Sequence, residues 1–126
     1  MVGGVEYQTA FDAGLINTIT AGDLATLLVE IGQGHVLSSG SAALMRDILL
    51  AQEFNEKIPA GLPPGTRVAH KTGEITAVSH DAAIVYPQNH PPYILVVMSR
   101  NIANEHTAQA MIADISRQVY AFSTSR

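Results

Sequence analysis

The sequence predicts an α+β fold in which antiparallel sheet strands pack against helices. Apolar residues recur at helical spacing twice in the first half of the chain, and three runs rich in β-branched or small residues follow. We expect residues 1–66 to form a loop, a helical hairpin and a crossing loop. Residues 67–101 should form three antiparallel strands, and residues 104–121 a final helix. The chain 1–126 is thus interpreted as one domain or a fragment of one.

Length and composition are those of a globular chain. Of the 126 residues, 47% are apolar and 14% are charged, which argues against disorder. The net charge of −4 comes without a Lys/Arg run, so we expect neither nucleic acid nor an anionic membrane as a partner. The longest apolar run, 93–98, is much shorter than the roughly 20 residues that span a bilayer. No targeting signal is recognised in the sequence, which leaves its localisation open.

The two expected helices of the hairpin have recognisable starts. Thr20 places a hydroxyl where it can cap a helix, and Asp23 follows three positions later. The first helix should run over about 21–32, with Leu24, Leu27, Leu28 and Ile31 forming its apolar stripe. Hydroxyls at 38–41 precede a second helix over about 41–52, whose apolar positions are Leu44, Met45, Ile48 and Leu49. Residues 1–19 are interpreted as a loop with one short helical turn around 7–13.

The second half of the chain is expected to contain the sheet. Prolines and glycines across 53–66 remove donors and fix backbone angles, which predicts an ordered crossing loop without a regular element. The expected strands are 67–75, 79–86 and 92–100. The last of these is almost continuously apolar, which predicts burial on both faces. Asn104 can cap the final helix, whose stripe contains Ala108, Met111, Ile112, Ile115 and Val119.

A Lys-Thr-Gly triplet, Lys71–Gly73, lies on the first expected strand. Three residues alone are a weak signal, but the same triplet is a signature of serine β-lactamases. Segments 17–25, 58–66 and 79–85 accompany it in the expected order. Residues 5–122 therefore resemble the second half of class A β-lactamases and their serine-hydrolase relatives. The resemblance implies part of a β-lactamase/transpeptidase-like fold, and a periplasmic or secreted complete parent.

The resemblance implies roles for particular residues. In the family, the lysine and hydroxyl matched by Lys71 and Thr72 line the active site and bind the substrate carboxylate. Gly73 leaves room for substrate beside the strand, and the backbone N–H of Glu74 matches a donor to the acyl oxyanion. His80 occupies what looks like the position of an arginine that assists carboxylate binding. Unlike that arginine, a histidine is only partly charged at neutral pH.

Two family motifs are missing from the sequence. The nucleophile belongs to Ser-x-x-Lys, but residue 54, three before Lys57, is Phe, and residue 68, three before Lys71, is Val. Ser-Asp-Asn is also absent, since Ser99–Asn101 keeps only its ends and lies at the close of the last strand. Glu6 falls roughly where the deacylating glutamate would be, without the usual pattern around it. Glu6 is therefore a candidate catalytic base.

Other kinds of site are not indicated. The five histidines, at 35, 70, 80, 90 and 106, have no i, i+4 pair or His-x-His spacing. The glycine-rich segments lack the lysine and the strand–turn–helix context of a phosphate loop. We therefore expect no metal and no cofactor.

Two functional hypotheses follow. In the first, the chain is the C-terminal part of a class A β-lactamase-like serine hydrolase, supplies the Lys-Thr-Gly wall of the active site, and is inactive alone. The complete parent would hydrolyse a β-lactam or a related amide or ester through an acyl-serine. In the second, the chain is a non-catalytic binding or self-associating domain. The expected partners are accordingly an N-terminal half or a second copy of the chain.

Overall fold

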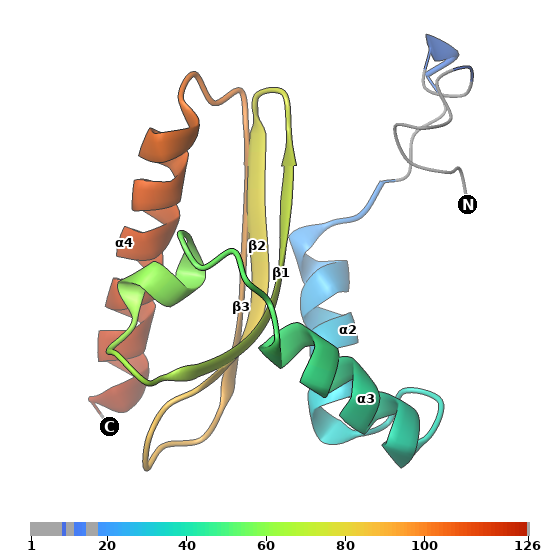
Figure 1. Ribbon diagram of the computed structural model, residues 1–126, viewed down its shortest axis with the longest axis vertical. Helices are drawn as coiled ribbons and strands as arrows, with labels where there is room; N and C mark the ends of the chain where they lie inside the picture. The colour runs from blue at the N-terminus through green and yellow to red at the C-terminus, as the bar shows by residue number, and fades with distance from the viewer. Residues whose placement is uncertain (1–8, 10–11, 15–17, 126) are drawn as a thin grey trace.

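The computed structural model describes residues 9, 12–14 and 18–125 and forms three layers (Figure 1). A three-stranded sheet lies in the middle. Helix α4 (Glu105–Thr124) and the short 3-10 helix η1 (Ile58–Gly61) cover one face, and helices α2 (Ala21–Gln33) and α3 (Ser39–Leu50) cover part of the other. The predicted α+β class is confirmed. None of the described helices is long and apolar enough to cross a membrane.

Local capping explains where the helices begin. The Thr20 hydroxyl accepts from the backbone N–H of Asp23, and the Asp23 carboxylate accepts from the backbone N–H of Thr20, which completes a capping box. Gly34 ends α2 in the left-handed conformation, with φ of 80°. Ser38 caps α3 and Asn104 caps α4 through their side-chain oxygens. Helix α3 starts and ends two residues earlier than expected, and α4 runs three residues further.

The crossing loop contains a regular element that the sequence did not lead us to expect. Residues 58–61 form η1, with Pro59 in its first turn, where a missing N–H costs nothing. A Cβ on Gly61 would lie 2.0 Å from the Ala113 carbonyl oxygen, so η1 packs directly against the backbone of α4. The prediction of an irregular loop was therefore wrong at these four residues.

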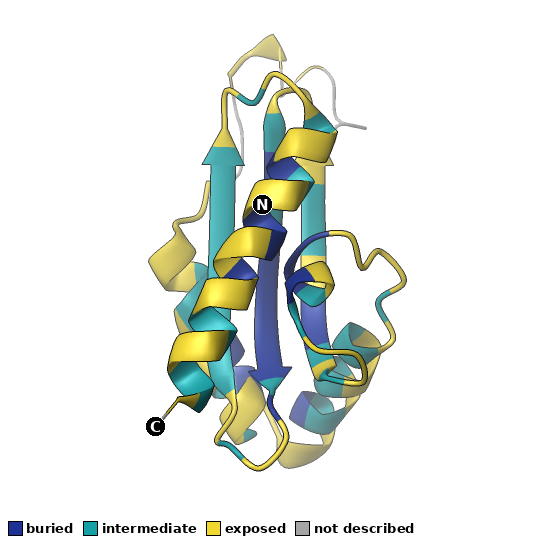
Figure 2. Ribbon diagram, turned by 90° about the vertical axis from the view of Figure 1, so that its left-hand side faces the viewer, coloured by how far each residue is buried: buried dark blue, intermediate teal, exposed yellow. Residues whose placement is uncertain are grey.

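The sheet has the order β1–β2–β3 and is antiparallel throughout. Its strands are β1 (Arg67–Ile75), β2 (Val78–Tyr86) and β3 (Tyr93–Arg100). Burial on both faces was predicted for β3, but Figure 2 shows it half-buried and the central strand β2 most buried. The reason is position: among the described residues β3 has a strand neighbour on one side only. Apolar content alone cannot distinguish a central strand from an edge strand.

Two apolar clusters, one on each face of the sheet, form the core. Leu28 and Ile31 of α2 pack with Ala69, Ala82 and Ile84 on one face, and Ile58, Ala83, Val85 and Ile112 pack together on the other. The predicted helical stripes are only partly buried. Their exposed members are Leu27, Leu44, Ile48, Met111 and Ile115, with 39–63% of each residue accessible. The sequence correctly predicted which face of each helix is apolar. It did not predict how much of that face is buried against the rest of the chain.

Candidate active site

The Lys-Thr-Gly triplet lies in the second half of β1, on the strand that forms one edge of the described sheet. Successive strand side chains alternate between faces, and directly paired residues share a face. Lys71 pairs with Ala82 and Gly73 with His80, on the α2–α3 face, whereas Thr72 pairs with Asp81 on the α4 face. The two polar side chains of the triplet therefore leave the strand in opposite directions.

The ammonium of Lys71 is exposed and donates to the backbone carbonyl of Thr72. No carboxylate among the described residues lies within ion-pair distance of it. An exposed, unneutralised ammonium can accept an anionic ligand without first breaking an ion pair. This is the arrangement that a carboxylate-binding lysine requires.

Gly73 has open space beside it. A Cβ built there would meet only Cβ and Cδ2 of His80, at 3.9 and 4.0 Å, which are ordinary contact distances. The described part of the chain therefore contains no packing reason for a glycine at this position. An external molecule lying against the strand would provide one.

His80 lies next to Gly73 across the strand pair, and one ring nitrogen is already occupied. Its Nδ1 is 2.9 Å from the Ser79 carbonyl oxygen and 3.1 Å from the Ser99 backbone nitrogen. Nε2 has no partner among the described residues. Any contact of His80 with an anion would therefore involve Nε2, on the opposite sheet face from the Thr72 side chain.

His70, which precedes the triplet in β1, and Asp81, which pairs with Thr72 across the sheet, form a buried pair that sequence reasoning missed. Their exposures are 1% and 0%, and His70 Nδ1 lies 3.0 Å from Asp81 Oδ1. Asp81 Oδ2 accepts from the backbone N–H of Ile58, and His70 Nε2 lies 3.3 Å from Asn55 Oδ1. The pair joins β1, β2 and the segment that enters η1. An acid within the small and apolar run 81–85 was the available sequence signal.

A second polar cluster lies on the α4 face and contains the other lysine. Lys57 is 1% exposed, and its Nζ lies 2.7 Å from Glu74 Oε1 and 3.8 Å from Glu105 Oε1. The ammonium also donates to the His80 carbonyl at 3.2 Å, and the Ser79 hydroxyl donates to Glu105 Oε1 at 2.8 Å. We call Lys57, Glu74, Ser79 and Glu105 the Lys57 cluster. Sequence reasoning considered Lys57 only as a failed Ser-x-x-Lys match.

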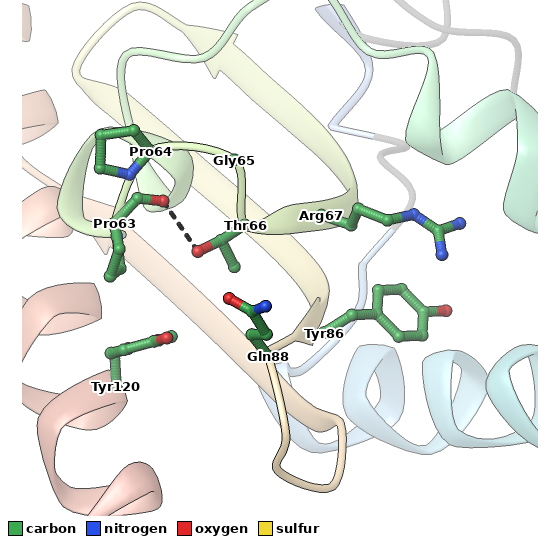
Figure 3. Close-up of a pocket in the computed structure, with 8 residues that line it drawn as sticks. All are labelled: Pro63, Pro64, Gly65, Thr66, Arg67, Tyr86, Gln88 and Tyr120. Atoms are coloured by element: carbon green, nitrogen blue, oxygen red, sulfur yellow. Dashed lines mark hydrogen bonds between the residues drawn. The ribbon is translucent and has the colours of Figure 1, made fainter.

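The remaining predicted site residue, Glu6, lies outside the described residues. A hollow of about 390 Å³ contains none of the predicted site residues (Figure 3). It lies where β1 begins, at the opposite end from the triplet, and is lined by Arg67, Tyr86, Gln88, Tyr120 and residues 63–66. Arg67 stands over the Tyr86 ring, 5.5 Å from its centroid. This hollow is therefore separate from the candidate active site.

Known proteins resemble the chain in both sequence and structure. The extended-spectrum β-lactamase PER-1 of Pseudomonas aeruginosa is 30% identical in an alignment 106 residues long, which covers 78% of this chain and 34% of that protein. β-Lactamase 3 of Bacillus cereus is 31% identical over 82% of this chain and 34% of its own length. The solved structure of PBP-A superposes with a TM-score of 0.76 at 34% identity, covering 95% of this chain and 51% of that one.

These similarities in sequence and structure show which class and which family the chain belongs to. The fold and the Lys-Thr-Gly strand together are those of β-lactamase-like serine hydrolases. One of the similar structures is the class A β-lactamase of the last common ancestor of Gram-negative bacteria. It matches with a TM-score of 0.74 at 30% identity, over 79% of this chain and 39% of that one. The chain belongs to the β-lactamase enzyme family, whose model matches residues 4–123. It spans about a third of the length of the curated relatives, at 34% of each.

Proposed function

We propose that these 126 residues supply one wall of a β-lactamase-like active site whose nucleophilic serine lies on polypeptide outside them. The complete site would hydrolyse a β-lactam or a related amide or ester through an acyl-serine intermediate. The observation that carries the proposal is the Lys71–Gly73 strand in a family member whose sequence contains no Ser-x-x-Lys. The chain alone is then a binding surface without a nucleophile, and is inactive.

Each site residue has a proposed role. The Lys71 ammonium and the Thr72 hydroxyl leave β1 towards opposite faces and bind the substrate carboxylate at the free edge of that strand. Lys71 also takes part in proton transfer. The substrate lies against Gly73, and the Glu74 N–H donates to the acyl oxygen as charge develops there. His80 assists the carboxylate through Nε2. Glu6 is proposed as the base that activates water for deacylation.

Two structural observations support these roles. The Lys71 ammonium is exposed and has no carboxylate partner among the described residues, and a glycine at 73 has no packing explanation within them. The likeness to a mutant of PBP-A, solved as an acyl-enzyme complex with penicillin G, supports the chemistry by analogy. That structure matches with a TM-score of 0.76 at 34% identity, over 95% of this chain and 51% of that one.

Mixing the chain with an N-terminal half that bears Ser-x-x-Lys tests the proposal. We expect a chromogenic cephalosporin to be hydrolysed by the mixture and by neither part alone, with any covalent adduct found by intact mass on the N-terminal half. Lys71→Ala should lower kcat/KM at least a hundredfold. Arg67→Ala is the matched control, because it removes another exposed cation from the far end of the same strand. A covalent adduct on this chain would refute the proposal.

Gly73→Ala separates a substrate-binding role of this position from a structural one. Alanine fits without a clash and favours an extended strand over glycine by about 0.5–1 kcal/mol, so we expect the free energy of unfolding to stay the same or rise. Activity in the mixture should nevertheless fall at least tenfold, because the new methyl group occupies the substrate's place. Unchanged activity together with unchanged stability would contradict the proposed contact.

A non-catalytic, self-associating domain is the second candidate function. The exposed apolar residues of α3 and α4 and the single-sided pairing of β3 favour it. If the mixture gives no turnover while the chain forms a defined oligomer in solution, this second function is preferred.

A further inference from the structure

Lys57 is a buried charged side chain on the α4 face of the described sheet, 1% exposed, and the proposed function gives it no role. Burying an ammonium costs several kcal/mol unless charges and hydrogen bonds compensate it, and a well-packed apolar residue is often as stabilising. Three partners compensate it here: the Glu74 carboxylate, the Glu105 carboxylate and the His80 carbonyl. Such a lysine is better explained by what it holds in place than by stability.

The group that Lys57 holds most closely is Glu74, which directly follows the Lys-Thr-Gly triplet. The Glu74 carboxylate is 2.7 Å from Lys57 Nζ, whereas the Glu105 carboxylate is 3.8 Å away. Glu74 pairs across the sheet with Ser79, whose hydroxyl donates to Glu105. The Lys57 cluster therefore ties the last residues of β1 to the start of β2, to the N-terminal turn of α4 and to the segment before η1.

The cluster also compensates the charge of Glu74, the residue that directly follows the triplet. Thr72 and Glu74 are two residues apart and share the α4 face, so their side chains leave the strand about 7 Å apart. This separation is within the Debye length of about 8–10 Å at physiological ionic strength. Without Lys57, a carboxylate bound at Thr72 would meet an uncompensated Glu74 charge, and the side chain that anchors the strand end would be free to move.

We propose that Lys57 is a positioning residue for the substrate-binding end of β1. It fixes Glu74, and with it the backbone N–H of that residue, and it neutralises the acid that directly follows the carboxylate-binding triplet. This inference rests on the proposed function for its catalytic consequence. The positioning of Glu74 by its ion pair with Lys57 does not depend on that function.

The hold is tested on the chain itself by ¹⁵N relaxation of backbone amides. In the parent chain we expect the Glu74 order parameter to be near the rigid value of about 0.85, falling below about 0.6 in Lys57→Met. Lys57→Arg should restore it, and the start of β1 should be unaffected in every variant. Asp114→Asn is the matched control, since it breaks an ion pair with Arg117 on the exposed side of α4.

If Lys57→Met does not fold, Glu74→Gln gives the same test. It removes the closer carboxylate while leaving Glu105 to compensate the buried lysine, and we expect the same loss of order at residues 73–75. A folded Lys57→Met or Glu74→Gln variant whose Glu74 order parameter is unchanged would overturn the proposal.

The catalytic consequence is measured in the active mixture with the N-terminal half. Lys57→Met should lower kcat at least tenfold, with a smaller change in KM, because a misplaced oxyanion donor costs most in the transition state. Lys57→Arg should recover most of the loss. A purely structural role would instead reduce activity only in proportion to the folded fraction, and that result would overturn the proposal. If the unmodified mixture shows no turnover, the proposed function fails, while the relaxation measurement still decides whether Lys57 holds Glu74.

Discussion

The hydroxyl of Tyr93, the first residue of β3, is buried and has no hydrogen-bond partner among the described residues. Burial, and to a lesser degree the nearby Tyr120, raises the pKa of Tyr93 to about 12. Leaving such a group unpaired destabilises the folded state relative to the unfolded one, where water hydrates it. The position is therefore sensitive to both substitution and alkaline pH.

Tyr93→Phe should leave the free energy of unfolding at pH 7 unchanged or raise it by up to about 1 kcal/mol, because it removes an unsatisfied polar group. The parent should lose stability as the pH rises from about 10, where the unfolded tyrosine loses its proton, towards about 12, where the folded one does. The variant should lack this part of the loss. Urea unfolding at pH 7 and pH 11 measures both effects, and Tyr86→Phe is the control. An equal alkaline loss in both variants would contradict the assignment.

Local signals in the sequence were enough to predict the contacts of residues whose partners are close to them in the chain. Thr20 and Asp23 bond to each other's backbone within three positions, so the capping box could be deduced from residue types alone. Lys57 could not be interpreted in this way. Its partners lie on β1, β2 and α4, and nothing in the residues around it indicates burial.

At the scale of elements, the contact between η1 and α4 is the tightest backbone approach found at a described glycine. Gly61 has no room for a side chain because the Ala113 carbonyl would be 2.0 Å from a new Cβ. The Ser116 hydroxyl also donates to the Ile58 carbonyl at 2.8 Å. Helix α4 therefore fixes η1. Helix η1 directly follows Lys57 and begins at Ile58, whose backbone N–H donates to Asp81.

Gly61→Ala should lower the free energy of unfolding by about 1–3 kcal/mol, because η1 must shift away from α4. Gly22→Ala is the matched control: its new Cβ would meet only the Thr20 hydroxyl, at 3.7 Å, and alanine favours a helix over glycine. Thermal unfolding followed by circular dichroism measures both variants. Equal melting temperatures for the two variants would show that η1 is not held by this contact.

Element positions were largely predictable, whereas their surroundings were not. Period-2 and period-3.6 patterns placed the helices and strands within about three residues, since they reflect local geometry. Whether an apolar residue is covered depends on what packs over it. Ile112 and Met111 are adjacent in the predicted α4 stripe, yet one is 2% exposed and the other 60%.

For the whole molecule, the unburied apolar surface has a consequence for behaviour in solution. The exposed residues of α3 and α4 lie on opposite sides of the sheet, and β3 is paired on one side only in the described chain (Figure 1). An unpaired edge strand presents free backbone donors and acceptors to a second chain. Adding an N-terminal half would compete for the same edge if the proposed function is right.

We therefore expect the isolated chain to self-associate with increasing concentration, measured by light scattering coupled to size exclusion. Met98→Lys should reduce the association if it uses the β3 edge, because an edge lysine discourages strand pairing. Met111→Lys makes the same substitution on the exposed surface of α4 and should reduce it only if the helices are the contact. An N-terminal half should dissolve the oligomer while restoring turnover. A monomer at high concentration would contradict the expectation, since the apolar surface and the β3 edge would then be tolerated in water without a partner.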